Sequence, residues 1–441
     1  MLLSMTLANY KSVKESQTIS FVALSDKRMD LTKTVAGTDK FNVLKSSAII
    51  GPNGAGKSTF IRALEAVKGI LFAAEDSPNP LKRYLAKAAF AYGDGKTRPC
   101  EITMEILLDK GVAGDEEKPS IVAIYKIKAT QERFYEESLY YVINGSKKVM
   151  FERIYENGAY TYRFGKYYRG EKKRQAAKLQ EDRSFLQGAA LKGGATASEL
   201  YSWFENTLDV LPLGYGASAE KVIIDALKAH PDWSDQIVNF LWALDITDIY
   251  RLQVLRNDKG METVGISHCF VNAKGTEAYG QTFMNESLSL RRLILIAVSF
   301  FEAFTGEKTI VIDDFGQLLH PYVLCHIVEL FHANDTQSQL IVVDCNPALL
   351  QQGLLRKDSI WFAEKGDDEL ENGKENGGEE KGTQRCDVPF SCLHRHLHKG
   401  GEGHDVQKLT EYVLRKLSED DMNNDEDEGL EEDILRELED A

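Results

Sequence analysis

A glycine-rich stretch near the N-terminus has the residue types and the spacing that hold a phosphate chain. It reads Gly51-Pro-Asn-Gly-Ala-Gly-Lys-Ser58, after an apolar run at 47–50 and before an amphipathic segment at 58–75. The pattern G-x-x-x-x-G-K-[ST] between a strand and a helix is that of a P-loop. Its glycines let backbone N–H groups face an anion, and the N-terminus of the following helix points at the same anion. The stretch therefore predicts a nucleoside triphosphate site.

The side chains of this loop divide the expected contacts between phosphate and metal. Lys57 is predicted to reach the β- and γ-phosphates, and the Ser58 hydroxyl is predicted to ligate Mg²⁺. The remaining nucleotide contacts are expected from Gly51, Asn53, Gly54, Gly56 and Thr59. The expected cofactors are therefore ATP and Mg²⁺.

Strand and helix patterns alternate along residues 1–365. Helical periodicity is predicted for 58–75, 184–250 and 290–304. Continuous apolar runs at 309–313 and 339–343 suit buried parallel strands. Shorter strands are expected at 2–7, 18–24, 102–108, 121–125, 138–142, 160–164, 250–254 and 264–271, with hairpin turns at Asn144-Gly145 and Asn157-Gly158. The order of these patterns predicts an α/β protein.

The net charge of −15 is concentrated at the C-terminal end. Residues 418–441 hold 13 acids and one arginine, and 366–380 hold seven acids and one lysine. Residues 381–417 are slightly basic, so the charges of 1–365 balance to about zero. The near-neutral body neither indicates nor excludes a surface for nucleic acid.

Three features bear on location. The N-terminus lacks the basic start and long apolar stretch of a signal peptide. No run approaches the roughly 18 apolar residues of a membrane span, so no membrane partner is expected. Six scattered cysteines suggest reduced thiols. The predicted location is the cytoplasm.

Several short motifs occur along the chain in a characteristic order. They are Asn9-Tyr-Lys-Ser12, the P-loop, Glu136-Glu-Ser-Leu-Tyr140, Phe151-Glu-Arg153, Tyr201-Ser-Trp-Phe204, Glu286-Ser287, Arg291-Arg292, Ile312-Asp-Asp314, Leu319-His-Pro321 and 355–365. In this order and spacing the chain resembles the ABC/SMC-type P-loop ATPases of the AAA-15/AAA-21 group, found in abortive-infection and other phage-defence systems. It is also similar to the ATPase part of OLD-family proteins.

The resemblance implies an ABC-type head, with a mixed N-terminal sheet, a parallel core sheet and a helical insertion. The N-terminal lobe with the P-loop would span 1–165, and the helical insertion 166–250. The C-terminal lobe would span 251–365, followed by a flexible acidic segment at 366–441.

The resemblance also implies roles at the end of the 309–313 strand. Asp313 would hold Mg²⁺ through water, as the acid of a Walker B motif does. The catalytic position falls at Asp314, where the family has a glutamate, so the carboxylate is one methylene shorter. A misplacement of about 1 Å can slow a reaction on the order of 10²-fold.

Other family positions also differ. Ser287 and Ser289 lie in the implied signature that contacts the partner's nucleotide; Ser289 replaces a glycine and Leu290 a hydroxyl residue. Gly316 stands where the family has a dimer-loop aspartate. The switch histidine falls at Cys345, or at Asp344 if the alignment shifts by one residue. These departures imply weak hydrolysis.

The resemblance implies an ATP-dependent sensor or scaffold of a phage-defence system that forms a homodimer or higher oligomer around ATP. A nuclease effector encoded nearby would act with it, and DNA is a possible ligand. Two alternatives stay open: an active ATPase of DNA repair or chromosome maintenance, and an ATP-binding scaffold without turnover.

The C-terminal segment carries two further hypotheses. Cys386, Cys392 and four histidines at 394–404 form either a zinc site or a solvated basic segment, and their spacing is not that of a zinc finger. The acidic residues 418–441 are expected to be mobile and to dock on a basic surface, a partner's or the chain's own 166–177 stretch.

Overall fold

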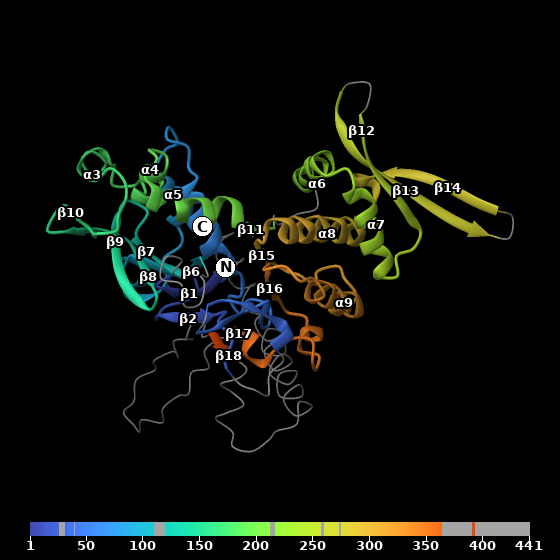
Figure 1. Ribbon diagram of the computed structural model, residues 1–441, viewed down its shortest axis with the longest axis horizontal. Coiled ribbons are helices and arrows are strands. Elements are labelled where there is room, and N and C mark those ends of the chain that lie inside the picture. The colour runs from blue at the N-terminus through green and yellow to red at the C-terminus, as the bar shows by residue number, and fades with distance from the viewer. Residues whose placement is uncertain are drawn as a thin grey trace, which may run out of the picture.

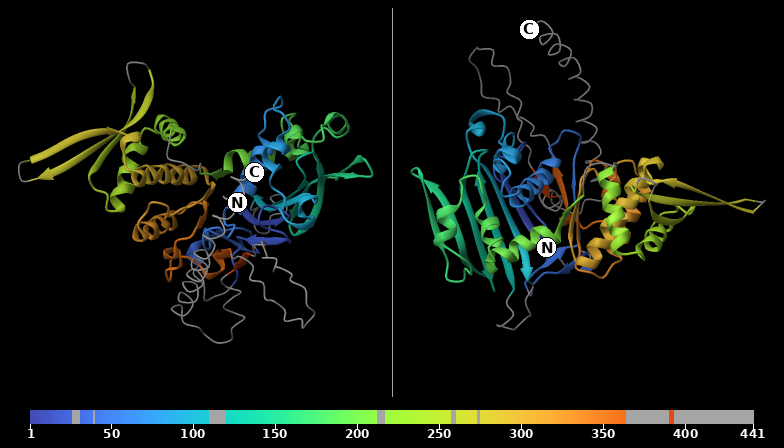
Figure 2. Two further views of the ribbon diagram at one scale, coloured as in Figure 1. Left: turned by 180° about the vertical axis from the view of Figure 1, so that it is seen from behind. Right: turned by 90° about the horizontal axis from the view of Figure 1, so that it is seen from above.

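The computed structural model describes residues 1–25, 31–38, 40–109, 120–211, 217–256, 260–272, 275–363 and 390–392. The zinc and acidic-tail hypotheses fall almost wholly outside these residues. Within them, a large antiparallel sheet and a small projecting sheet lie at opposite ends of the molecule, with a parallel sheet between them (Figures 1 and 2). No helix of this described part is long and apolar enough to cross a membrane.

The antiparallel sheet has seven strands in the order β10-β9-β8-β7-β6-β1-β2. Its hairpin turns at Asn144-Gly145 and Asn157-Gly158 have positive φ at both positions, as predicted. Between these turns lies β9, which the pattern did not predict because four consecutive residues, 150–153, are buried and no alternation appears. The strands are β1 (Leu2–Ala8), β2 (Gln17–Ser20), β6 (Cys100–Asp109), β7 (Ile121–Ala129), β8 (Phe134–Ile143), β9 (Ser146–Glu156) and β10 (Ala159–Phe164).

The second sheet has the order β11-β15-β16-β5-β17-β18, and all its pairings are parallel except that of β17 with β18. β5, β15, β16 and β17 are buried along their whole length, which explains their continuous apolar sequences. The strands are β5 (Ser46–Ile50), β11 (Leu208–Val210), β15 (Thr309–Ile312), β16 (Gln339–Asp344), β17 (Ile360–Ala363) and β18 (Phe390–Cys392). The predicted α/β fold, with an N-terminal sheet and a parallel core sheet, is confirmed.

Two hydrophobic cores flank the parallel sheet. The first lies between this sheet, the antiparallel sheet, α1, α4 and α5; the second lies between this sheet, α6–α9 and the projecting sheet. The helices are α1 (Ser58–Leu71), α2 (Pro80–Leu85), α3 (Lys173–Lys178), α4 (Phe185–Ala190), α5 (Ala195–Ser202), α6 (Ala217–Ala229), α7 (Trp233–Ala243), α8 (Leu288–Gly306) and α9 (Pro321–His332). A π-helical turn (Trp203–Thr207) follows α5, and 3₁₀ turns occupy Leu31–Lys33, Gly93–Lys96, Phe283–Asn285, Pro347–Leu350 and Lys357–Ser359.

The projecting sheet consists of β12 (Ile249–Arg256), β13 (Glu262–Asn272) and β14 (Gly275–Thr282). It packs on α6 and α7 and extends away from the parallel sheet (Figure 1). The Ser234 hydroxyl of α7 donates to the Leu252 carbonyl of β12 at 2.6 Å. A further two-stranded ribbon pairs β3 (Thr34–Ala36) with β4 (Asn42–Leu44).

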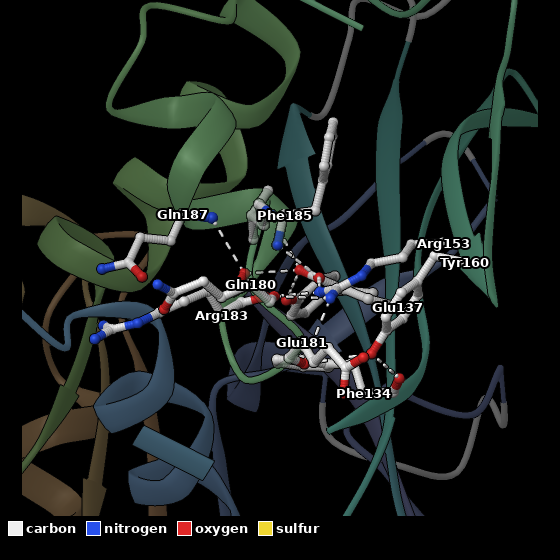
Figure 3. A network of polar contacts seen from close by, with 12 residues as sticks. Phe134, Glu137, Arg153, Tyr160, Gln180, Glu181, Arg183, Phe185 and Gln187 are labelled. Carbon is white, nitrogen blue, oxygen red and sulfur yellow. Dashed lines mark hydrogen bonds and ion pairs between the residues drawn. The ribbon is translucent and has the colours of Figure 1, made fainter. Parts of the chain in front are cut away.

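A buried ion pair ties the segment before α4 to the antiparallel sheet (Figure 3). Glu137 of β8 and Arg153 of β9 have fully buried side chains 3.6 Å apart. The Glu137 carboxylate accepts hydrogen bonds from the Tyr125 and Ser184 hydroxyls and from the backbone N–H groups of Phe185 and Leu186. Arg153 donates to backbone carbonyls at 180–183. The pair therefore fixes the start of α4.

The same segment also holds the chain that leaves α1. Arg183 donates to the carbonyls of Ala74, Glu75 and Ser77, and the Gln187 amide donates to Ala73 at 2.6 Å. In Figure 3 both side chains point away from the ion pair. α1 ends at Leu71, four residues earlier than predicted, and residues 73–77 form this tethered loop.

Candidate nucleotide-binding site

The P-loop connects β5, a central strand of the parallel sheet, to α1. Gly54 and Gly56 adopt φ values of 76° and 82°, a conformation that side chains disfavour. At Gly51, a Cβ atom would lie only 2.3 Å from the Ala363 carbonyl of β17. The glycines are therefore required by the local backbone and by the neighbouring strand. The predicted strand–loop–helix context is present.

Lys57 is almost completely buried at the end of this loop, and its Nζ donates to the Pro52 carbonyl at 2.6 Å. Burial lowers the pKa of Lys57, while the nearby Cys345, Asp314, Asp344 and Asp313 act in the opposite direction. The cation is thus folded against its own loop, close to the acidic ends of β15 and β16. Asn53 lies in the same loop and is exposed.

Ser58 and Asp313, the two predicted metal ligands, lie side by side. The Ser58 hydroxyl donates to Asp313 Oδ1 at 3.4 Å. Burial, and then the neighbouring Asp314 carboxylate, raise the pKa of Asp313, so a cation here would relieve an unfavourable negative charge. One carboxylate and one hydroxyl suit Mg²⁺, which prefers oxygen ligands and keeps several from water and phosphates. The residues fit the metal.

Thr59 extends the site toward β1. Its hydroxyl lies 2.7 Å from that of Ser12. Ser12 belongs to the Asn9–Ser12 turn, and the Asn9 amide donates to the carbonyls of Gly95, Arg98 and Pro99. This chain of contacts connects the P-loop helix to the first strand of the antiparallel sheet.

Asp314, the predicted catalytic carboxylate, directly follows Asp313 and has a left-handed backbone with φ of 46°. Arg292 of α8 donates to the carbonyls of Asp313 and Asp314 at 2.8 and 3.0 Å and is almost fully buried. It therefore clamps the backbone that presents both acids. The sequence motif included Arg292, but nothing in the sequence indicated this contact.

Asp344 holds together the loops that follow β15 and β16. Its carboxylate accepts the backbone N–H groups of Gly316, Cys345 and Asn346, the last two at 2.7 and 3.0 Å. Asp344 is buried, whereas Cys345 is exposed. The carboxylate of Asp344 is thus engaged by backbone, and the side chain at the open end of β16 is Cys345.

Gly316 stands in a closely packed position. A Cβ atom added there would lie 2.7 Å from Asp344 Oδ2 and 2.9 Å from the Leu324 side chain. Since real Cβ atoms are not found this close to other atoms, no side chain fits without a shift of the loop. The position where the resemblance implies an aspartate is therefore closely packed by Asp344 and Leu324.

The two implied signature serines lie at the N-terminus of α8. The Ser287 hydroxyl caps the helix by accepting the Leu290 N–H at 3.2 Å. The Ser289 hydroxyl donates to the Leu318 carbonyl at 2.8 Å. The structure thus gathers Lys57, Ser58, Asp313 and Asp314 at the carboxyl ends of the parallel strands, and it places Ser287 and Ser289 on a separate element that contacts the loop after β15.

Comparisons with known proteins place this geometry in a wider context. A family model described as an AAA domain matches residues 4–208, which include the P-loop and all of the antiparallel sheet except the first two residues of β1. No curated protein sequence matches the chain. The P-loop motif, the assembled site and this match together support a P-loop nucleotide-binding domain of the AAA kind.

Solved structures similar to the chain include three SMC heads. One is an SMC head bound to the C-winged-helix domain of ScpA (12% identity over 90% of this chain and 99% of that chain, TM-score 0.44). Another is the SMC head domain from Thermotoga maritima (13% identity over 89% and 98%, TM-score 0.39). A third is the head with an extended coiled coil, bound to the C-terminal domain of ScpA derived from Pyrococcus furiosus (12% over 90% and 98%, TM-score 0.37).

Proposed function

We propose that this chain is a Mg-ATP-dependent sensor or scaffold of a phage-defence system, which self-associates around ATP and hydrolyses it slowly. One observation carries the proposal. The groups that would bind nucleotide and metal are assembled, while the positions that would serve hydrolysis are altered or packed shut.

The binding half of the proposal rests on the P-loop and Asp313. Lys57 would pair with phosphate oxygens, and Ser58 and Asp313 would hold Mg²⁺. Bound Mg²⁺ would supply positive charge against the phosphates. The glycines already shape the loop, so binding would mainly require Lys57 Nζ to exchange the Pro52 carbonyl for phosphate oxygens.

The hydrolytic half rests on Asp314, Gly316 and Cys345. The Asp314 carboxylate is one methylene shorter than glutamate, and Arg292 holds its backbone carbonyl, so the side chain cannot advance by a backbone shift without breaking that contact. An aspartate at Gly316 would require Asp344 or Leu324 to shift, because its Cβ would lie less than 3.0 Å from both side chains. Cys345 offers a weak donor in place of a histidine. Together these features favour slow turnover.

The proposed partners follow from the same scheme. Ser287 and Ser289 would contact nucleotide bound to a second copy of the chain, giving a homodimer or higher oligomer. A nuclease encoded nearby would serve as effector, DNA is a possible ligand, and the setting would be cytoplasmic.

The test combines light scattering, turnover and protection from infection. The wild type should associate on addition of Mg-ATP and turn over well below ~1 s⁻¹, the low end for typical enzymes. Expressed with its neighbouring genes, it should protect cells from phage, and Lys57→Ala should abolish both association and protection. A single unchanged species with and without Mg-ATP would contradict the proposal. Turnover of many per second, stimulated by DNA, would instead indicate DNA repair or chromosome maintenance, and binding without any turnover a pure scaffold.

A further inference from the structure

Three ionisable side chains connect the projecting sheet to the start of α8. His268 of β13 lies between two carboxylates, with Nδ1 2.8 Å from Asp248 Oδ2 and Nε2 2.8 Å from Glu286 Oε1. Asp248 lies just before β12, and Glu286 directly precedes Ser287, the N-cap of α8. The ring of Tyr279 from β14 stacks on the imidazole, with centroids 4.7 Å apart and planes within 6°.

The two contacts define the protonation state of His268. Ionised carboxylates only accept hydrogen bonds, so both ring nitrogens must carry protons. Burial acts to lower the pKa of His268, but the hydrogen bonds and charges of Asp248 and Glu286 outweigh it and raise the pKa. This geometry favours an imidazolium at His268, between two negative groups.

Glu286 depends on this cation more than Asp248 does. The Glu286 side chain is 7% exposed, whereas that of Asp248 is 55% exposed and well solvated. A buried carboxylate without a partner is costly, and it moves to water or takes up a proton. Arg291, on α8, donates its Nε–H to the backbone carbonyl of Glu286 at 3.0 Å. The side-chain carboxylate of Glu286 is paired instead with the His268 imidazole, whose Nε2 lies within 4 Å of it.

We infer that His268 is a positioning residue that fixes Glu286, and through it Ser287 and the start of α8, in the conformation that receives nucleotide from a second copy of the chain. The inference rests on the proposed function, because it assigns His268 to the same ATP-dependent association. Glu286 and Ser287 are adjacent, so a displaced Glu286 carboxylate would turn the backbone that carries the Ser287 cap. Loss of His268 should therefore weaken association without changing ATP binding at the P-loop.

The effect should depend on pH with a defined sign. Since the pKa of His268 is raised in the folded protein, its contribution is fully present below the unfolded value of about 6.5 and is lost as pH rises through the folded pKa. Wild-type association should weaken over that upper range. Among the described residues, Tyr279 stacks on the imidazole ring and Arg291 donates to the backbone carbonyl of Glu286.

The experiment compares His268→Gln with Ser234→Ala, which removes a hydroxyl contact between α7 and the same sheet but leaves Glu286 untouched. ATP affinity is measured by calorimetry, and Mg-ATP-dependent association by analytical ultracentrifugation from pH 6 to 8.5. His268→Gln should weaken association about tenfold or more at pH 6 and flatten its pH dependence, with ATP affinity unchanged. Ser234→Ala should keep the wild-type pH profile.

A milder variant guards against misfolding of His268→Gln. Asp248→Asn removes only the exposed carboxylate, so the folded pKa of His268 should fall and association should weaken at lower pH than in the wild type. Equal association and equal pH profiles for wild type and His268→Gln would overturn the inference, as would an Asp248→Asn profile that coincides with the wild type. Absence of ATP-dependent association in the wild type would instead overturn the proposed function.

Discussion

Replacing Glu137 with glutamine should strongly destabilise the lobe that contains the P-loop. The substitution preserves size but removes the charge that four donors and Arg153 share (Figure 3). Arg153 would remain completely buried without a counter-charge. The NH₂ group of the new glutamine side chain would also face the donors that the carboxylate now accepts. Removing one partner of a buried pair costs about 3–5 kcal/mol.

The loss should also extend to the loop after α1. Arg153 and Glu137 fix residues 180–186, and Arg183 in that segment holds the carbonyls of 74–77. Loosening the segment should therefore increase hydrogen exchange of the loop at 73–77, while α9, packed in the other core, should be unaffected.

Urea unfolding gives the measurement, and Glu152→Gln is the matched control. Glu152 lies on β9 beside Arg153, but its partner Arg163 is 66% exposed. A pair of this kind contributes about 1 kcal/mol or less. The urea midpoint of Glu137→Gln should fall well below that of Glu152→Gln. Equal midpoints, or no change in exchange at 73–77, would refute the view that this ion pair anchors the segment.

Three further predictions concern the altered positions and the tail. Asp314→Glu should raise single-turnover ATP hydrolysis by no more than about tenfold, because Gly316 and Cys345 remain; restoration of many turnovers per second would show that the shorter carboxylate was the sole defect. Gly316→Ala should lower the free energy of unfolding by about 1–3 kcal/mol, since its Cβ would meet Asp344 and Leu324; an unchanged urea midpoint would show that the loop is free to move. Deletion of 418–441, which lies outside the described residues, should leave ATP binding intact and weaken partner association at low salt. The contact is electrostatic, and the Debye length is ~10 Å at 0.1 M salt. A large fall in melting temperature would place the tail in the folded core.

The elements that carry a continuous or periodic apolar signal could be predicted from sequence. β5, β15 and β16 are buried on both faces, so their sequences form apolar runs. The P-loop is recognisable because its backbone has positive φ at two positions, where glycine is favoured. β9 escaped because its buried residues are consecutive, and β14 because it is rich in glycine and polar residues. α9 was also not predicted. It begins at Pro321, the last residue of the Leu319-His-Pro321 motif.

The polar contacts of the site could not be predicted. Arg292, Asp344 and His268 each make a contact with a group between 18 and 28 residues away, and such pairings depend on how elements approach in space. A sequence offers no period or spacing for them. The related motif marked Arg292 as a residue of interest, but its task as a clamp on Asp313 and Asp314 is visible only in the fold.

The most direct test of the central claim is calorimetric titration of Mg-ATP into the wild type and Lys57→Ala. Lys82→Ala serves as a control, because that side chain is exposed on α2. If Lys57 holds phosphate, its loss removes charge-assisted contacts, each contributing about 1.5–3 kcal/mol, so affinity should fall about ten- to hundredfold or more while the melting curve without nucleotide stays close to that of the wild type. Lys82→Ala should bind as the wild type does. Equal affinities for wild type and Lys57→Ala would contradict a nucleotide site at the P-loop.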